Sequence, residues 1–107
     1  MPYYALFYDV VDDFPAKRMP FRTNHLQLVE EAHQRGELLL AGALGRPDGA
    51  GASGALLIFR AADASVAENF AKRDPYVKAD LVTQWRVQPY MQVIATEPGE
   101  DALVKAR

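Results

Sequence analysis

The stretch Asp74-Pro75-Tyr76 decides how the second half of this chain folds, because it ends one helical pattern and precedes a long alternating run. Proline disfavours the helical region for the residue before it. Regular helix is therefore expected to stop near Arg73 or Asp74, which leaves the Asp74 carboxylate at an element end, where a side chain can be aimed. The buried face of this expected helix has four apolar residues at helical spacing: Val66, Ala67, Phe70 and Ala71.

The start of the same helix has two candidate caps. Asp63 can cap it, and so can Ser65, which has Glu68 three residues on as a possible capping box. The residues alone leave both alternatives open.

Leu81 to Ile94 shows the clearest alternation in the sequence and predicts a long, half-buried strand. Proline cannot donate to a strand ladder, so Pro89 favours an edge strand or a bulge. The apolar residues that alternate along one side are Trp85, Val87, Pro89, Met91 and Val93.

The first half of the chain predicts a strand and a helix. Tyr3 to Val10 is an aromatic and aliphatic run typical of a buried strand. Val11 to Met19 lacks periodicity and indicates a loop. Pro20 suits the first position of a helix that runs to about Arg35, with Gly36 as its left-handed stop.

Two further apolar runs, Glu37 to Ala43 and Ala55 to Ala61, predict strands joined by a glycine-rich connection. The order is then strand, helix, strand, strand, helix, strand, which is the order of the ferredoxin-like βαββαβ fold, an α+β fold with two helices on one face of an antiparallel sheet. The other face would be bare. We therefore expect a homodimer or a dimer-based oligomer, with the apolar side of the last strand or the tyrosine-rich first strand as the contact surface.

Composition bounds the class of protein. The 107 residues predict one domain over residues 1–95, followed by a loosely attached tail over residues 96–107. Twelve basic against fourteen acidic residues give a net charge of −2, which argues against nucleic acid as a partner. The chain contains no cysteine and no apolar run of bilayer-spanning length, so a cytoplasmic protein that does not enter membranes is expected.

His25 lies on the apolar stripe of the first expected helix, where a titratable ring needs a polar partner. One interpretation pairs it with Asp74, because a carboxylate on one imidazole nitrogen leaves the other free to move a proton. The alternative is a structural core histidine and an Asp74 that only caps a helix end. Periodicity alone favours that alternative. A metal site is not expected, since His25 and His33 are eight residues apart and no third ligand has suitable spacing.

Three more residues are candidates for binding a small-molecule ligand. Arg22 precedes His25 by about one helical turn and could present a guanidinium to an anion. Tyr76, like Tyr4 and Tyr8, could offer its hydroxyl to a ring-shaped ligand. Ser53, in the glycine-rich connection, could offer a hydroxyl. Solvation, packing and turn formation are the ordinary alternatives for these three residues.

Between residues 3 and 94 the chain resembles the YciI-like (YCII-related) family. The order and spacing of several short motifs carry the resemblance: Tyr3-Tyr4-Ala5-Leu6-Phe7, Arg22-Thr23-Asn24-His25-Leu26, Arg35-Gly36-Glu37-Leu38, Ala41-Gly42, Ser53-Gly54, Asp74-Pro75-Tyr76-Val77 and Val87-Gln88-Pro89-Tyr90. The resemblance implies a small dimeric α+β barrel in which His25 and Asp74 match a proposed active-site pair.

What the resemblance implies about activity is less specific. One type of relative is a dehydrochlorinase that acts on a chlorinated hydroxyquinol, and the fold is similar to that of muconolactone isomerases. A lyase or isomerase that needs no cofactor is therefore expected. A non-catalytic module that binds a metabolite or serves dimerisation is the main alternative, and a cofactor-free monooxygenase is a third.

Overall fold

The computed structural model describes residues 1–95, which form one antiparallel sheet and a layer of helices. The expected tail over residues 96–107 lies outside the described residues. The elements, in chain order, are β1 (Tyr3–Val10), α1 (Phe14–Lys17), the 3₁₀ turn η1 (Met19–Phe21), α2 (Arg22–Gln34), β2 (Leu38–Gly45), β3 (Ala52–Arg60), α3 (Ser65–Arg73), α4 (Pro75–Lys78) and β4 (Val82–Tyr90).

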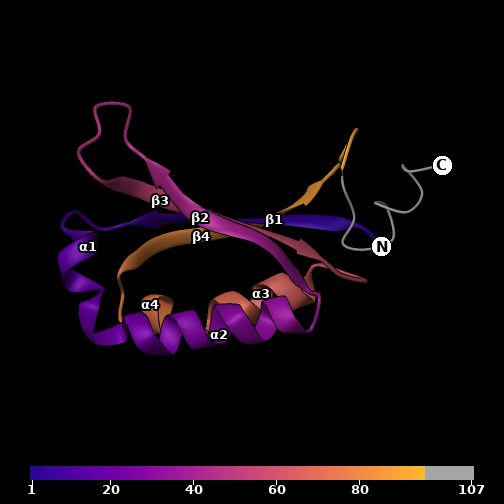
Figure 1. Ribbon diagram of the computed structural model, residues 1–107, viewed down its shortest axis with the longest axis horizontal. Helices are drawn as coiled ribbons and strands as arrows, with labels where there is room; N and C mark the ends of the chain where they lie inside the picture. Colours follow the sequence, from indigo (N-terminus) through magenta and orange to yellow (C-terminus); the bar gives the residue numbers. More distant parts are fainter. Residues whose placement is uncertain (96–107) are drawn as a thin grey trace.

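The sheet has the order β2-β3-β1-β4, and every neighbouring pair is antiparallel. Figure 1 shows α2, α3 and α4 together on one side of this sheet. The predicted ferredoxin-like α+β fold is thus confirmed. β4 lies at an edge of the sheet, which is where a strand that contains Pro89 is tolerated.

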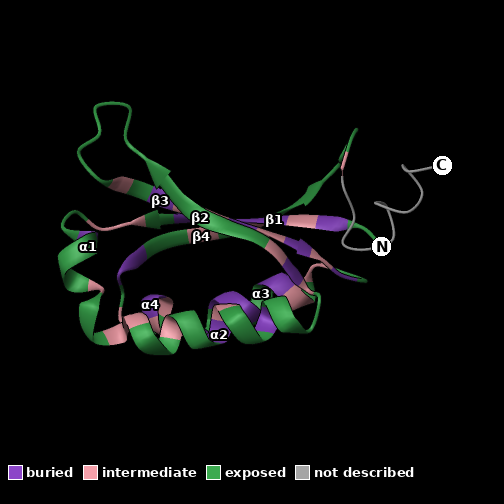
Figure 2. Cartoon of the chain, viewed as in Figure 1, coloured by how far each residue is buried: buried purple, intermediate pink, exposed green. Residues whose placement is uncertain are grey.

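The core lies between the sheet and the helices. Leu6, Leu38 and Phe59 are fully buried side chains that reach it from three different strands. From α3, Phe70 packs edge-on against Phe59, with ring centroids 5.3 Å apart. Figure 2 shows the buried stretches of α2 and α3 on the sides of these helices that face the sheet, with exposed residues on their outer sides.

The opposite face of the sheet has no covering element among residues 1–95 (Figure 1). Residues that are paired side by side across strands share a face. Phe7 pairs with Leu56, which pairs with Gly42, and in the next row Ile58 pairs with Leu40. Leu40 is 70% exposed. We call this surface, centred on Leu56 and Ile58, the bare sheet face.

One sequence expectation about the bare sheet face is wrong. The apolar side of the last strand does not supply this surface, because Trp85 and Val87 pack against the core under the sheet. The alternation along β4 is as predicted, but its apolar side faces the helices and not the bare sheet face. The first strand does contribute, through Phe7, whose ring lies under the Arg86 guanidinium at 4.2 Å.

Three short helical segments, α1, η1 and α4, are absent from the sequence prediction. The predicted loop from Val11 to Met19 contains α1, which begins after Asp13, a residue with φ of 60°. The main helix begins at Arg22 rather than at Pro20, because Pro20 lies inside the 3₁₀ turn η1. Helices of three or four residues are too short to show a hydrophobic period, so the pattern could not reveal them.

The helix stops were predicted more accurately. Gly36 has φ of 79°, as expected of a left-handed stop after α2. The N-cap position of α3 is Ala64, which makes no side-chain cap hydrogen bond, so neither candidate occupies it. Asp63, one residue earlier, accepts hydrogen bonds from the backbone N–H and the hydroxyl of Ser65, the first residue of α3. These bonds lower the pKa of Asp63 below its ordinary value.

Gly54 is fixed by a close approach between β3 and β1. A Cβ atom at this position would lie 2.2 Å from the carbonyl oxygen of Tyr8, which is backbone and cannot move aside cheaply. We expect Gly54→Ala to lower the free energy of unfolding by about 1–3 kcal/mol. Urea denaturation would measure the loss.

The matched control is Gly45→Ala at the end of β2, where an added Cβ meets nothing within 4 Å. Its effect should stay within about 0.5 kcal/mol. Equal effects of the two substitutions would contradict the close approach.

Candidate functional site

Asp74 sits between two helices and serves both ends. It follows α3 with an extended backbone (φ −66°, ψ 124°), as the proline after it predicted. It also precedes α4, where its Oδ1 accepts a hydrogen bond from the backbone N–H of Tyr76 at 3.0 Å. Asp74 is therefore the N-cap of α4 and Pro75 its first residue, a pair that signals a helix start. Only a helix stop was predicted from Pro75.

The Asp74 carboxylate is wholly buried, with 0% of the residue exposed. Besides the Tyr76 N–H, it accepts a hydrogen bond from the Tyr8 hydroxyl at Oδ2 (2.8 Å). Its third partner is Nδ1 of His25, 2.8 Å from Oδ1. A buried charge is tolerated when its lone pairs are satisfied, and these three bonds come from three different elements, β1, α2 and α4.

The His25 ring has one nitrogen committed and one left over. An ionised carboxylate only accepts hydrogen bonds, so beside an ionised Asp74 the donor must be Nδ1, and in the neutral ring Nε2 then keeps its lone pair. The ring stacks on that of Tyr76, with centroids 3.9 Å apart and an interplanar angle of 16°. Its side chain is 15% exposed. The imidazole is thus held in place while part of it remains accessible.

Two tyrosines belong to this site: Tyr76 stacks on the imidazole, and Tyr8 donates to Asp74. Phe14 meets the Tyr76 ring edge-on, with centroids 5.1 Å apart. Burial raises the pKa of Tyr76 above its ordinary value, and the charge of Asp74 adds to this, whereas the charges of Arg18 and Arg22 act in the opposite direction. Burial raises the pKa of the Tyr8 hydroxyl strongly, reinforced by the charge of Asp74 and the hydrogen bond to it. Tyr8 therefore stays a donor to the carboxylate.

A cavity of about 180 Å³ opens beside this group. It lies between the sheet and α2, near η1. The residues that line it are Tyr8, Val10, Phe14, Arg18, Arg22, His25, Leu26, Val29, Ala41, Gly42, Ala43, Gly54, Ala55, Leu57 and Tyr76. The lining is mostly apolar, with two arginines, two tyrosines and one histidine as its polar members.

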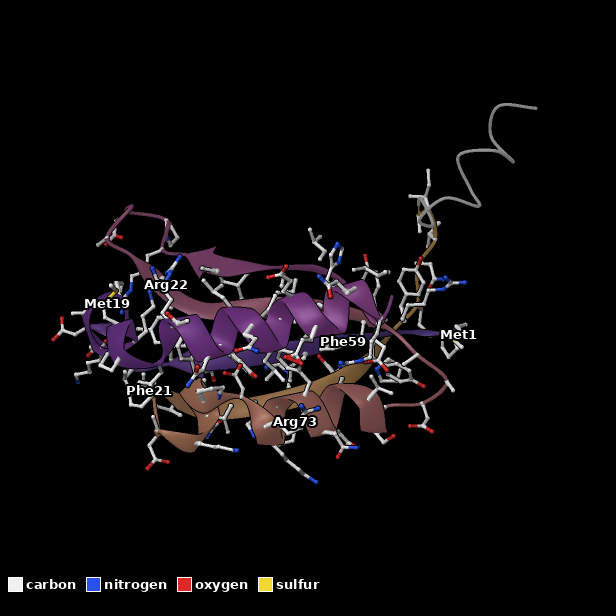
Figure 3. All side chains as sticks on the ribbon, turned by 60° about the horizontal axis from the view of Figure 1, so that its bottom comes forward. Met1, Met19, Phe21, Arg22, Phe59 and Arg73 are labelled. Atoms are coloured by element: carbon white, nitrogen blue, oxygen red, sulfur yellow. The ribbon has the colours of Figure 1, made fainter. Side chains whose placement is uncertain are left out.

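The structure brings four of the five predicted site residues together. His25, Arg22 and Tyr76 line the cavity, and Asp74 lies behind His25. Figure 3 shows Arg22 at the same end of the molecule as Met19 and Phe21. Ser53 is the exception, because it is exposed, does not line the cavity, and donates its hydroxyl to the carbonyl of Leu44 at 3.4 Å. No contact supports the ligand-binding role predicted for it.

Tyr8 was expected only to offer a hydroxyl to a ring-shaped ligand, whereas in the structure its hydroxyl donates to Asp74. The period of two along β1 places Tyr8 on the same face as Leu6, the face that meets the helices. Arg18 gave no signal, since it follows α1 in a segment without periodicity.

The fold class can be compared with solved structures. A 5-chloro-2-hydroxyhydroquinone dehydrochlorinase (TftG) from Burkholderia phenoliruptrix, solved with 2,5-dihydroxybenzoquinone, has a TM-score of 0.69 at 18% identity, over 84% of this chain and 94% of that one. An antibiotic biosynthesis monooxygenase has a TM-score of 0.51 at 12% identity, over 88% of this chain and 100% of the other. Both likenesses show the dimeric α+β barrel fold class.

The family follows from the sequence comparisons. The chain belongs to the YCII-related domain family, whose model matches residues 1–91. It is 30% identical over 95 residues to the protein YciI of Escherichia coli O6:H1, covering 84% of this chain and 97% of that protein. It is 29% identical over 96 residues to an uncharacterized protein of Haemophilus influenzae, covering 85% and 98%.

Residues 1–95 were also considered for a membrane span and for a metal site. No helix there is long and apolar enough to cross a membrane. No group of three or more histidine, cysteine, aspartate or glutamate side chains in this range could hold a metal ion.

The Tyr8 hydroxyl should stabilise the fold in a pH-dependent way. We expect Tyr8→Phe to lower the free energy of unfolding by about 1–3 kcal/mol at neutral pH, because a buried carboxylate loses a donor. The folded-state pKa of Tyr8 is raised, so the folded chain keeps a proton that the unfolded chain loses above pH ~10. Wild-type stability should therefore approach that of the variant as pH rises above ~10.

Denaturation of both proteins at neutral and alkaline pH measures this difference. Tyr90→Phe is the control, because Tyr90 is 49% exposed on the edge strand and should change stability little. A Tyr8→Phe protein as stable as wild type at neutral pH would show that the hydroxyl does not support Asp74.

Proposed function

We propose that this protein is a small, cofactor-independent enzyme in which His25 and Asp74 form an acid–base pair. The observation that carries the proposal is the hydrogen bond between Asp74 Oδ1 and His25 Nδ1, made by a wholly buried carboxylate to a ring on a cavity wall. An orienting carboxylate fixes the tautomer of a histidine and stabilises its protonated form. Membership of the YCII-related family supports this proposal, because His25 and Asp74 match the active-site pair proposed for that family.

The reaction class proposed is elimination or isomerisation of a small ring compound. Nε2 of His25 would take a proton from the bound ring, and Asp74 would stabilise the imidazolium that forms. In an elimination the electron pair left on the ring forms the new double bond while the leaving group departs with its own pair. In an isomerisation the same nitrogen returns the proton to another atom.

The other lining residues would bind and shield the substrate. Arg22 is placed to attract an anionic group, and the stacked Tyr76 ring keeps the imidazole in one orientation. The apolar remainder of the lining would exclude water, which strengthens electrostatic interactions inside the cavity. A reaction on a quinol or quinone ring fits these properties, and the similar solved dehydrochlorinase is named for such a substrate.

The proposal predicts chloride release from 5-chloro-2-hydroxyhydroquinone by the wild-type protein. His25→Gln should slow the release by ~10²–10⁴, the usual contribution of a positioned acid–base group. The variant should still bind 2,5-dihydroxybenzoquinone, measured by calorimetry. His33→Gln is the control, because the Nδ1 of His33 contacts the carbonyl of Leu38 and not Asp74.

Other results would favour the alternative, a module that binds a metabolite without converting it. A wild-type protein that binds the quinone but releases no chloride is one such result. Undiminished turnover by His25→Gln is the other, because it would remove the histidine from the reaction.

We further propose that the protein forms a homodimer through the bare sheet face. The support is its apolar centre, Phe7, Leu56 and Ile58, which no element among residues 1–95 covers. The cytoplasmic location expected from the sequence stays a prediction.

The dimer can be tested by sedimentation at micromolar concentration. Leu56→Lys should weaken association at least about tenfold, because a charge placed in the centre of an apolar contact loses more than ~1.4 kcal/mol on burial. Met19→Lys, at a residue that is 62% exposed beside α2, should not change the association. A monomeric wild-type protein would overturn the proposal.

A further inference from the structure

The charges on the cavity wall are all of one sign. Arg18 and Arg22 line the cavity, whereas none of the aspartates and glutamates among residues 1–95 does. The Asp74 carboxylate, which is bonded to His25 and Tyr8 on the cavity wall, accepts hydrogen bonds from three donors. An incoming ligand therefore meets two permanent positive charges in a mostly apolar lining.

Neither of these arginines has an ionic partner within the described part of the chain. Within residues 1–95, Arg18 and Arg22 make no ion pair, whereas Arg35 pairs with Glu37 and Arg46 pairs with Asp12. The Nε atom of Arg18 is buried and has no hydrogen-bond acceptor in the described part of the chain. Buried polar atoms are ordinarily satisfied, and an N–H left unmatched at a cavity is what a bound acceptor would satisfy.

The placement of Arg18 suits such an acceptor. Its guanidinium lies 5.7 Å from the centre of the Phe14 ring, which holds it against the cavity wall. The charges of both Arg18 and Arg22 act on the Tyr76 hydroxyl, whose ring is stacked on His25. The two guanidinium charges and the imidazole therefore act on one small volume.

The size of that volume limits the ligand. An apolar protein cavity of about 150 Å³ holds one benzene molecule. A cavity of about 180 Å³ has room for a single six-membered ring with a small charged substituent, and a second ring would have to extend into solvent.

We propose that this cavity binds a single-ring monoanion, a carboxylate or phenolate, whose charged oxygen is bound by Arg18 and Arg22 while the ring lies on the apolar wall beside His25. The inference rests on the proposed function for its catalytic meaning. If His25 removes a proton from the ring, the same guanidinium groups stabilise the negative charge that develops. Arg18 thus becomes a residue that determines specificity.

Benzoate and benzamide are the probes, because they share a ring and differ in charge. Isothermal titration of the full chain should show benzoate bound at least about tenfold more tightly than benzamide. Arg18→Gln should lower benzoate affinity about tenfold and leave benzamide affinity unchanged. Arg22→Gln should act in the same direction. Arg35→Gln, which removes a charge remote from the cavity, should change neither.

Folding of each variant is checked by circular dichroism. Arg18→Lys keeps the charge but lacks Nε, so its preference for benzoate should be weaker than that of wild type and stronger than that of Arg18→Gln. If Arg18→Gln does not fold, the comparison of Arg18→Lys with wild type is the test. A wild-type protein that binds both probes equally, or binds neither, would overturn the proposal, and so would an Arg18→Lys protein with unchanged affinity for both.

The benzoate titration tests the anion site separately from the acid–base pair, which the chloride-release assay tests. His25→Gln should keep the preference for benzoate, because both guanidinium groups remain. Preference for benzoate without any turnover would leave the anion site standing and contradict the proposed function. Turnover without such a preference would do the opposite.

Discussion

The wholly buried carboxylate of Asp74 is the interaction on which the rest of this structure depends. It accepts three hydrogen bonds: one from a hydroxyl on β1, one from an imidazole on α2 and one from a backbone N–H on α4. A charge without these partners would be expensive to bury, so each bond fixes one element relative to the other two. The same three bonds that make the carboxylate tolerable also aim the imidazole at the cavity.

The cavity then combines two opposed electrical environments. The Asp74 carboxylate behind His25 has its hydrogen-bond partners, whereas Arg18 and Arg22 on the cavity wall have no ionic partner among residues 1–95. A proton moved to Nε2 would be stabilised from behind, and an anion formed on the ligand would be stabilised from in front. Proton abstraction from a small anionic ring therefore fits this arrangement better than binding of a neutral or cationic molecule.

Much of this could be predicted from the sequence, because the signals were periodic or local. The alternation of β4, the stop at Gly36 and the effect of Pro75 on Asp74 each have a physical cause that acts within a few residues. The pairing of His25 with Asp74 was suggested by family resemblance, and 49 residues separate the two in sequence. Periodicity could not have found it. Arg18 could not be predicted because its segment shows no periodicity, whereas the start of α4 has a local signal, Asp74 followed by Pro75. Ser53 does not line the cavity, because a glycine-rich connection does not fix where a hydroxyl points.

The central claim concerns which nitrogen of His25 carries the proton. Long-range ¹H–¹⁵N correlation spectra of ¹⁵N-labelled protein distinguish the two ring nitrogens directly. The structure predicts, for the neutral ring, a protonated Nδ1 and an unprotonated Nε2, with Asp74→Asn abolishing this preference. A neutral ring protonated at Nε2, or a tautomer ratio that Asp74→Asn leaves unchanged, would contradict the account.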